Sequence, residues 1–165
     1  MLAEATHATD QIFRRHQTAA PVDVLGIARD LGIAVFQSEE LGGPNLSGKL
    51  FRDTKHGGRS GWSIIVKASD PLVRQRFTIA HEIAHFVLHK DKIRNGVLTD
   101  DEFYRSGLSS LEETQANRMA ADILMPWHLI DTLTKAGITY IPELARKLVV
   151  SQVALKIRLG IPVTE

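Results

Sequence analysis

The chain has no cysteine among its 165 residues, which excludes disulfides, thiolate metal ligands and a cysteine nucleophile. It also has no apolar stretch as long as a membrane span, and its first residues lack the apolar core of a secretory signal. A formal net charge of +1 provides no general attraction to nucleic acid. The length and these absences predict a soluble cytoplasmic protein with one domain, or one domain and a small appendage.

Hydrophobic periodicity and turn residues place the predicted strands early in the chain and most helices late. Helices are predicted at residues 4–17, 22–31, 71–89, 110–124, 127–135, 142–148 and 151–159, and strands at 33–37, 47–52 and 61–67. Asp70 is expected to cap the helix that begins at Pro71. This order is typical of the α+β class, here with a small antiparallel sheet of about three strands and surrounding helices.

The C-terminal segment is predicted to differ from the rest of the chain. Residues 1–139 are expected to form the main domain, and residues 140–165 a small helical segment. The segment has the pattern of a helix-turn-helix, with Lys147, Lys156 and Arg158 close to the turn. Because it is short and has few basic residues, a helical hairpin packed on the main domain is favoured, and contact with DNA is the weaker alternative.

The segment His81-Glu82-Ile83-Ala84-His85 is the strongest chemical signal. Residues four apart project from one face of a helix, with Cβ atoms about 5–6 Å apart, so His81 and His85 can share one metal ion. Glu82 lies too far round the helix to ligate comfortably, but it can deprotonate a metal-bound water and pass the proton to the leaving amine. The alternative is two structural histidines that match the pattern by chance. That alternative is disfavoured because polar groups on a core-facing helix need partners, which a metal would supply.

The third ligand must be His, Asp or Glu, since a catalytic zinc usually has three protein ligands and cysteine is absent. Glu112 and Glu113 on the next long helix are the candidates. Glu113 is preferred because Asn117 follows four residues later, where it could hydrogen-bond a ligand imidazole. Alternatively, either glutamate completes a capping box, with Ser109 or Ser110 as the N-cap. One glutamate could also cap the helix while the other binds the metal.

These motifs resemble those of the ImmA/IrrE family of metallopeptidases, the M78 peptidases. The resemblance rests on residues 76–86 (RFTIAHEIAHF), on residues 113–118 (ETQANR) and on the following Leu124-Met125-Pro126. The family often has glycine where this chain has Ala84, but alanine is still small enough for close packing beneath a metal. The resemblance therefore implies a zincin-like minimal metalloprotease that retains its activity.

The resemblance also implies the role of each site residue: His81, His85 and Glu113 bind zinc, and Glu82 is the general base. A site of this composition can also accept Mn²⁺ or another divalent ion. The implied substrate is a regulatory protein, a helix-turn-helix transcriptional repressor. The alternative is a DNA-binding or antitoxin-like regulatory protein with a structural or vestigial metal site. The intact Glu82 argues against this alternative, because a structural site needs no base.

The groups that contact the substrate are less well defined by the sequence. The strand at residues 61–67 is expected to lie at the sheet edge, where it can pair with an extended substrate. Trp62 and Ser63 would then lie along the cleft, although a core position is favoured for Trp62. Four residues are candidates, by side-chain type only, for the donor that stabilises the oxyanion: Tyr104, Arg105, His89 and Tyr140.

Overall fold

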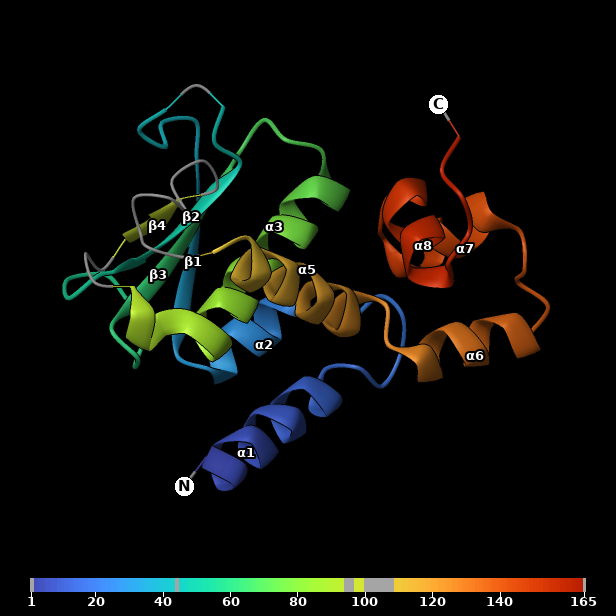
Figure 1. Ribbon diagram of the computed structural model, residues 1–165, viewed down its shortest axis with the longest axis horizontal. Coiled ribbons are helices and arrows are strands. Elements are labelled where there is room, and N and C mark those ends of the chain that lie inside the picture. The colour runs from blue at the N-terminus through green and yellow to red at the C-terminus, as the bar shows by residue number, and fades with distance from the viewer. Residues whose placement is uncertain (1, 44, 94–96, 100–108, 165) are drawn as a thin grey trace.

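The computed structural model describes residues 2–43, 45–93, 97–99 and 109–164, without the side chains of residues 2–5 and 97–99. Tyr104 and Arg105 lie outside this part. The α+β class is confirmed, and no helix among the described residues is long and apolar enough to cross a membrane. The elements shown in Figure 1 are α1 (Leu2–Arg15), α2 (Val24–Asp30), β1 (Ile33–Ser38), β2 (Gly48–Arg52), β3 (Trp62–Lys67), α3 (Leu72–His89), a 3₁₀ turn η1 (Lys90–Lys92), β4 (Val97–Thr99), α5 (Ser110–Leu124), α6 (Trp127–Lys135), α7 (Ile141–Leu148) and α8 (Gln152–Leu159).

The four strands form one sheet in the order β1-β3-β2-β4. β2 is antiparallel to both β3 and β4, as expected for a hairpin, but β1 is parallel to β3. The sheet is therefore mixed rather than wholly antiparallel. The reason is that β2 lies two positions from β1 in the sheet. β3 then fills the place between them, parallel to β1 and antiparallel to β2. The alternation of apolar residues defines each strand but not its neighbour, so the sequence pattern does not specify this crossing.

The position of β3 corrects the expectation that residues 61–67 lie at the sheet edge. β3 is hydrogen-bonded on both sides, so the edges belong to β1 and β4. The Trp62 ring is buried and packs edge-on against Phe86 of α3, with ring centroids 6.2 Å apart. Ser63 is also buried, and its hydroxyl donates a hydrogen bond of 2.8 Å to Asp53. Both residues stabilise the interior and do not line a cleft.

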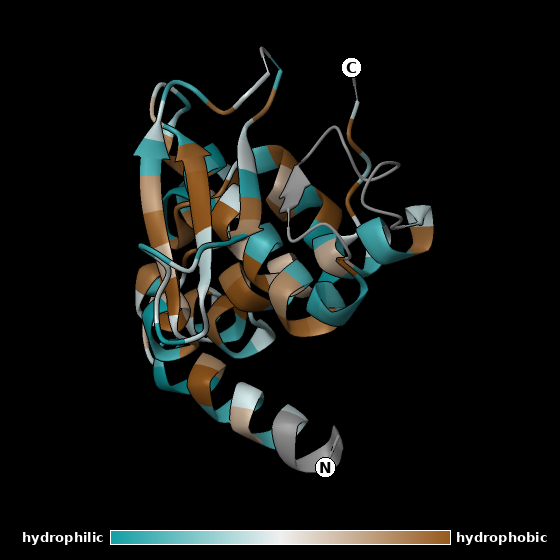
Figure 2. Ribbon diagram, turned by 90° about the vertical axis from the view of Figure 1, so that its left-hand side faces the viewer, coloured by the Kyte–Doolittle hydropathy of each residue, from teal (hydrophilic) through white to brown (hydrophobic). Residues whose placement is uncertain are grey.

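Helix α3 is the central element of the helical layer. It packs on β2 and β3, while α2 packs on α3 and β1, and α5 lies along α3. Figure 2 shows apolar residues along the strands and on the helices that cover them. The expected Asp70 cap is wrong: Pro71 is the N-cap, with no side-chain cap bond, and the Asp70 carboxylate lies 3.5 Å from the Arg74 guanidinium. Because that carboxylate pairs with Arg74, it does not cap the helix.

The C-terminal helices contact the rest of the chain through both apolar and polar groups. The buried residues Leu144, Leu148 and Leu155 belong to the same hydrophobic cluster as the sheet and α3. Arg76 of α3 donates a hydrogen bond of 3.3 Å to the Val149 carbonyl that follows α7. Arg158 of α8 forms a 2.7 Å ion pair with Asp122 of α5. Arg158, one of the basic residues considered for DNA contact, is thus paired within the molecule.

Gly48 of β2 allows α3 to approach the sheet closely. A Cβ at this position would lie 2.4 Å from the Thr78 Cγ2 atom and 3.1 Å from the Ile65 carbonyl oxygen. We expect Gly48→Ala to lower the free energy of unfolding by about 1–3 kcal/mol, the usual cost of overpacking. Denaturant unfolding measures this change. Against a Thr78→Ser background, which lacks Cγ2, the same substitution should cost less, and an equal cost in both backgrounds would contradict this contact.

Candidate metal centre

His81 and His85 project from the same face of α3. Their rings are nearly perpendicular, with centroids 4.5 Å apart, and their Nε2 atoms are 3.0 Å apart. His85 is buried and His81 is partly exposed. The four-residue spacing therefore brings two imidazole nitrogens to one point, as the sequence predicts.

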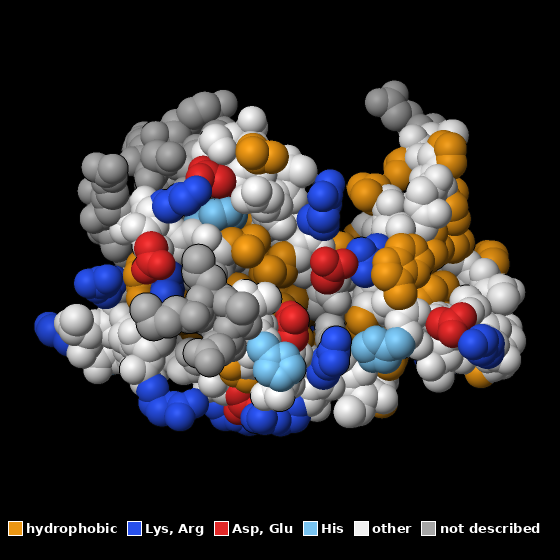
Figure 3. Space-filling view, turned by 60° about the horizontal axis from the view of Figure 1, so that its bottom comes forward, with side chains coloured by type: hydrophobic (Ala, Val, Ile, Leu, Met, Phe, Trp, Pro, Cys, Tyr) orange, Lys and Arg blue, Asp and Glu red, His pale blue; other side chains and the backbone are white. Residues whose placement is uncertain are grey.

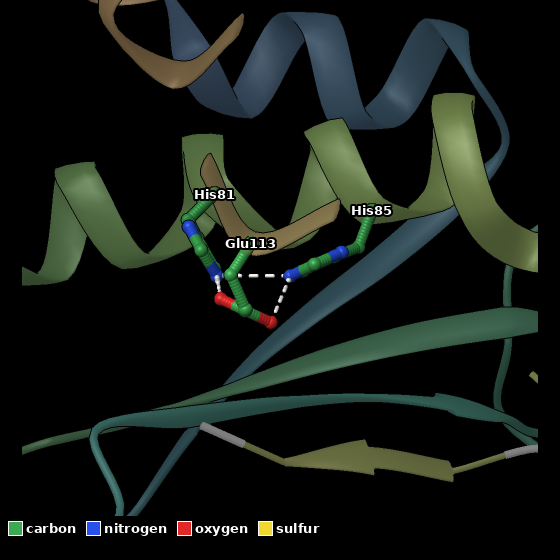
Figure 4. A group of neighbouring side chains, drawn as sticks. All are labelled: His81, His85 and Glu113. Atoms are coloured by element: carbon green, nitrogen blue, oxygen red, sulfur yellow. Dashed lines mark hydrogen bonds and ion pairs between the residues drawn. The ribbon is translucent and has the colours of Figure 1, made fainter. Parts of the chain in front are cut away.

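Glu113 of α5 completes a cluster of three metal-binding side chains (Figure 4). Its Oε2 lies 3.2 Å from the His81 Nε2, and its Oε1 lies 2.9 Å from the His85 Nε2. The start of α5 shows why this glutamate is available. Ser109 is the N-cap, and its backbone N–H donates a 2.6 Å hydrogen bond to the Glu112 carboxylate, while its hydroxyl accepts from the Glu112 N–H. Glu112 thus caps the helix, and Glu113 turns toward the histidines.

The spacing of these three groups fits a divalent cation. Ligands about 2.0–2.2 Å from a tetrahedral zinc ion lie roughly 3.3–3.6 Å from one another, close to the 2.9, 3.0 and 3.2 Å contacts of the cluster. Hydrogen bonds alone do not satisfy all three contacts. If both Nε2 atoms donate to Glu113, two N–H groups face each other across 3.0 Å. A cation between them would satisfy all three lone pairs at once.

The protonation states of Glu113 and His85 suit this purpose. Burial favours a higher pKa for Glu113, but hydrogen bonds from His81 and His85 outweigh burial and lower the pKa to about 2. Burial lowers the pKa of His85, and this effect outweighs the opposing influence of Glu113. At neutral pH the cluster therefore has a carboxylate beside a neutral imidazole, which are the forms that bind metal.

The other predicted site residues have different surroundings. Glu82 is on α3, one residue after the first histidine, and is only 1% exposed. Asn117 is exposed and lines a groove between α3, α5 and α8. Within the described part of the chain, no hydrogen bond joins Asn117 to His81 or His85. Its predicted contact with a ligand imidazole is therefore not seen.

His89 makes the contact with a ligand imidazole that the sequence predicted for Asn117. Its Nδ1 lies 3.0 Å from the His85 Nδ1, and its Nε2 lies 3.0 Å from the Gln115 Oε1. His89 was a candidate oxyanion donor, but both of its ring nitrogens have these partners. A signal was present in the sequence, because His89 repeats the four-residue step from His81 to His85. Tyr140, another candidate donor, is exposed just before α7.

An α+β fold with two histidines and a glutamate converging from adjacent helices defines a protein with a helix-borne candidate metal centre. The chain belongs to the M78 peptidase family of IrrE N-terminal-like domains, whose family model matches residues 28–160. The family resemblance seen in the sequence motifs is thereby confirmed.

Two known proteins show how far the similarity extends. The chain is 46% identical over 83 residues to the radiation response metalloprotease IrrE of Deinococcus deserti. The matched region covers 47% of this chain and 28% of that protein. A solved Mycobacterium tuberculosis transcriptional regulator shares the fold, with a TM-score of 0.60 and 16% identity over 96% of this chain and 47% of that chain. The chain thus spans less than half the length of either protein.

Proposed function

We propose that this chain is a zinc metallo-endopeptidase that selectively cleaves a regulatory protein, a helix-turn-helix transcriptional repressor. The observation that carries the proposal is the convergence of His81, His85 and Glu113 beside the buried Glu82. Membership of the M78 peptidases and the similarity to a metalloprotease support it. The same donor set can also accept Mn²⁺ or another divalent ion.

Each site residue has a separate task in this reaction. His81, His85 and Glu113 would hold the ion, which when bound supplies a Lewis acid and lowers the pKa of water. Glu82 takes a proton from the attacking water at its carboxylate and delivers it to the nitrogen of the leaving amine. Because Glu82 lies on the same helix as both histidines, it would be close to the reacting atoms without being a ligand.

A groove of about 810 Å³ supports a protein substrate. It lies near the cluster on both walls, since Phe77 precedes His81 by four residues, and Thr114 and Asn117 follow Glu113 by one and four. On α8, Val153 and Ile157 line the opposite side and are exposed. Figure 3 shows apolar side chains gathered over the C-terminal helices, at the right. Such a surface suits an apolar segment of a protein substrate.

The charge of the groove further defines the segment that it would bind. Three arginines line it, Arg74, Arg118 and Arg158, and the described lining residues include no carboxylate. Arg74 and Arg158 already pair with Asp70 and Asp122, so Arg118 is the arginine that would attract an acidic group. An acidic side chain in the bound segment would therefore be favoured over a basic one.

Ile157→Asp is expected to weaken substrate recognition. Ile157 is 68% exposed, so its replacement should leave the fold and metal binding unchanged, while a charge in the apolar groove raises KM by about tenfold, the effect of roughly 1.4 kcal/mol. Leu25→Asp is the matched control, because Leu25 is 56% exposed on α2, away from the groove. Cleavage rates at several substrate concentrations measure the effect. Equal KM values for the two variants would refute the assignment of the groove to substrate.

Intact-mass spectrometry tests the proposed function itself. The chain is incubated with zinc and a helix-turn-helix protein encoded beside its gene, with and without a chelator. We expect two fragments whose masses sum to the mass of the intact substrate plus one water, as a single cut requires. With the chelator, we expect no fragments. A stable stoichiometric complex without cleavage would instead identify a binding protein.

A further inference from the structure

We propose that His89 is a positioning residue that fixes the tautomer and the ring orientation of His85 for metal binding. The inference rests on the proposed metal site. His89 is the last residue of α3, and its side chain is only 2% exposed. Its ring lies against that of His85, with centroids 5.2 Å apart. The residue is thus buried beside a candidate ligand and does not face solvent.

The proton positions follow from the contacts of each ring nitrogen. For His85 to bind an ion through Nε2, that atom must present a lone pair, so the proton of the neutral imidazole is on Nδ1. This Nδ1–H donates to the His89 Nδ1, 3.0 Å away. His89 must therefore carry its own proton on Nε2, where it donates to the Gln115 Oε1 at 3.0 Å.

Gln115 determines which tautomer His89 adopts. With an amide oxygen facing Nε2, the tautomer of His89 with a proton on Nε2 is stabilised, and its Nδ1 remains an acceptor. The opposite tautomer would place two N–H groups face to face between His89 and His85. Because Gln115 lies two residues after Glu113 on α5, the same helix provides a metal ligand and the acceptor that ends this chain of hydrogen bonds. Such partners commonly orient a ligand imidazole and increase its basicity.

Two substitutions of His89 separate positioning from bulk. Asparagine retains an acceptor oxygen where the His89 Nδ1 lies, whereas leucine fills similar space without an acceptor. We expect His89→Leu to weaken zinc binding by about 10–100-fold and His89→Asn to change it by no more than about threefold. Competition with a chromophoric chelator measures the affinity. Thermal melting of the metal-free proteins should show similar stability for the two variants, which a merely structural role for His89 would not predict.

NMR of ¹⁵N-labelled histidines in the zinc-loaded wild-type protein provides a measurement that needs no variant. We expect a protonated Nδ1 on His85 and a protonated Nε2 on His89. A protonated His89 Nδ1, or wild-type affinity in His89→Leu, would overturn the inference while leaving the metal site intact. A wild-type protein that binds no divalent ion would overturn the proposed function and this inference together.

Discussion

Glu82→Gln is expected to abolish cleavage of the substrate while zinc remains bound. The substitution preserves the size of the side chain but removes the group that accepts a proton, so the rate should fall by about 10²–10⁴-fold, the range for loss of general acid–base catalysis. Glu82 lies on the same helix as His81 and His85 but is not part of the cluster of three ligands. Cleavage rate and metal content, measured on the same preparation, distinguish these two effects.

The thermal stability of the variant is the control for this prediction, because Glu82 is buried. A variant that melts near the wild-type temperature, contains one zinc ion per chain and does not cleave would support the role of base. Cleavage by Glu82→Gln at a rate near that of wild type would refute that role. Loss of zinc together with activity would show that Glu82 contributes to metal binding.

Glu113→Ala is expected to cause the largest loss of metal affinity that a substitution in α5 can produce. Glu113 provides the anionic group of the cluster, and without it two imidazoles would remain to hold a doubly charged ion. We expect affinity to fall by more than the roughly 10–100-fold that loss of a supporting partner typically costs. Titration with a competing chelator measures it.

Glu112→Ala is the matched control, since it changes the neighbouring carboxylate on the same helix. The Glu112 carboxylate completes the capping box of α5 and accepts a 2.7 Å hydrogen bond from the Lys92 ammonium. Its loss should lower the free energy of unfolding by about 1 kcal/mol, as for other helix caps, and leave zinc affinity nearly unchanged. If the two variants lost affinity equally, the division of roles between the two glutamates would be incorrect.

The sequence predicts the helices and three of the four described strands, because local signals define them, but it does not predict β4. Apolar periodicity places α3, and Pro126 and Gly137 bound α6. The arrangement of the sheet is not local: β1 pairs with β3, although β2 lies between them in the sequence, so the strand pattern alone does not reveal the parallel pair. The same limit applies to the edge strand, since the central position of β3 depends on how the chain crosses over the hairpin.

The candidate site also has features that the local sequence predicts and features that depend on the folded structure. The spacing of His81 and His85 on one helix is sufficient to predict that they share a face. The choice between Glu112 and Glu113 is not, because Ser109 and Ser110 each fit a capping box and only the structure shows which one forms. The contact of His89 with His85 depends on the rotation of both rings and on Gln115 from another helix. No sequence spacing determines that geometry.

The most direct test of the metal centre is a crystal structure of the zinc-loaded protein, with anomalous scattering measured at the zinc absorption edge. We expect a single strong peak about 2.0–2.2 Å from the His81 Nε2, the His85 Nε2 and a Glu113 carboxylate oxygen. A peak bound by other side chains, or no peak in a protein soaked with zinc, would contradict this expectation.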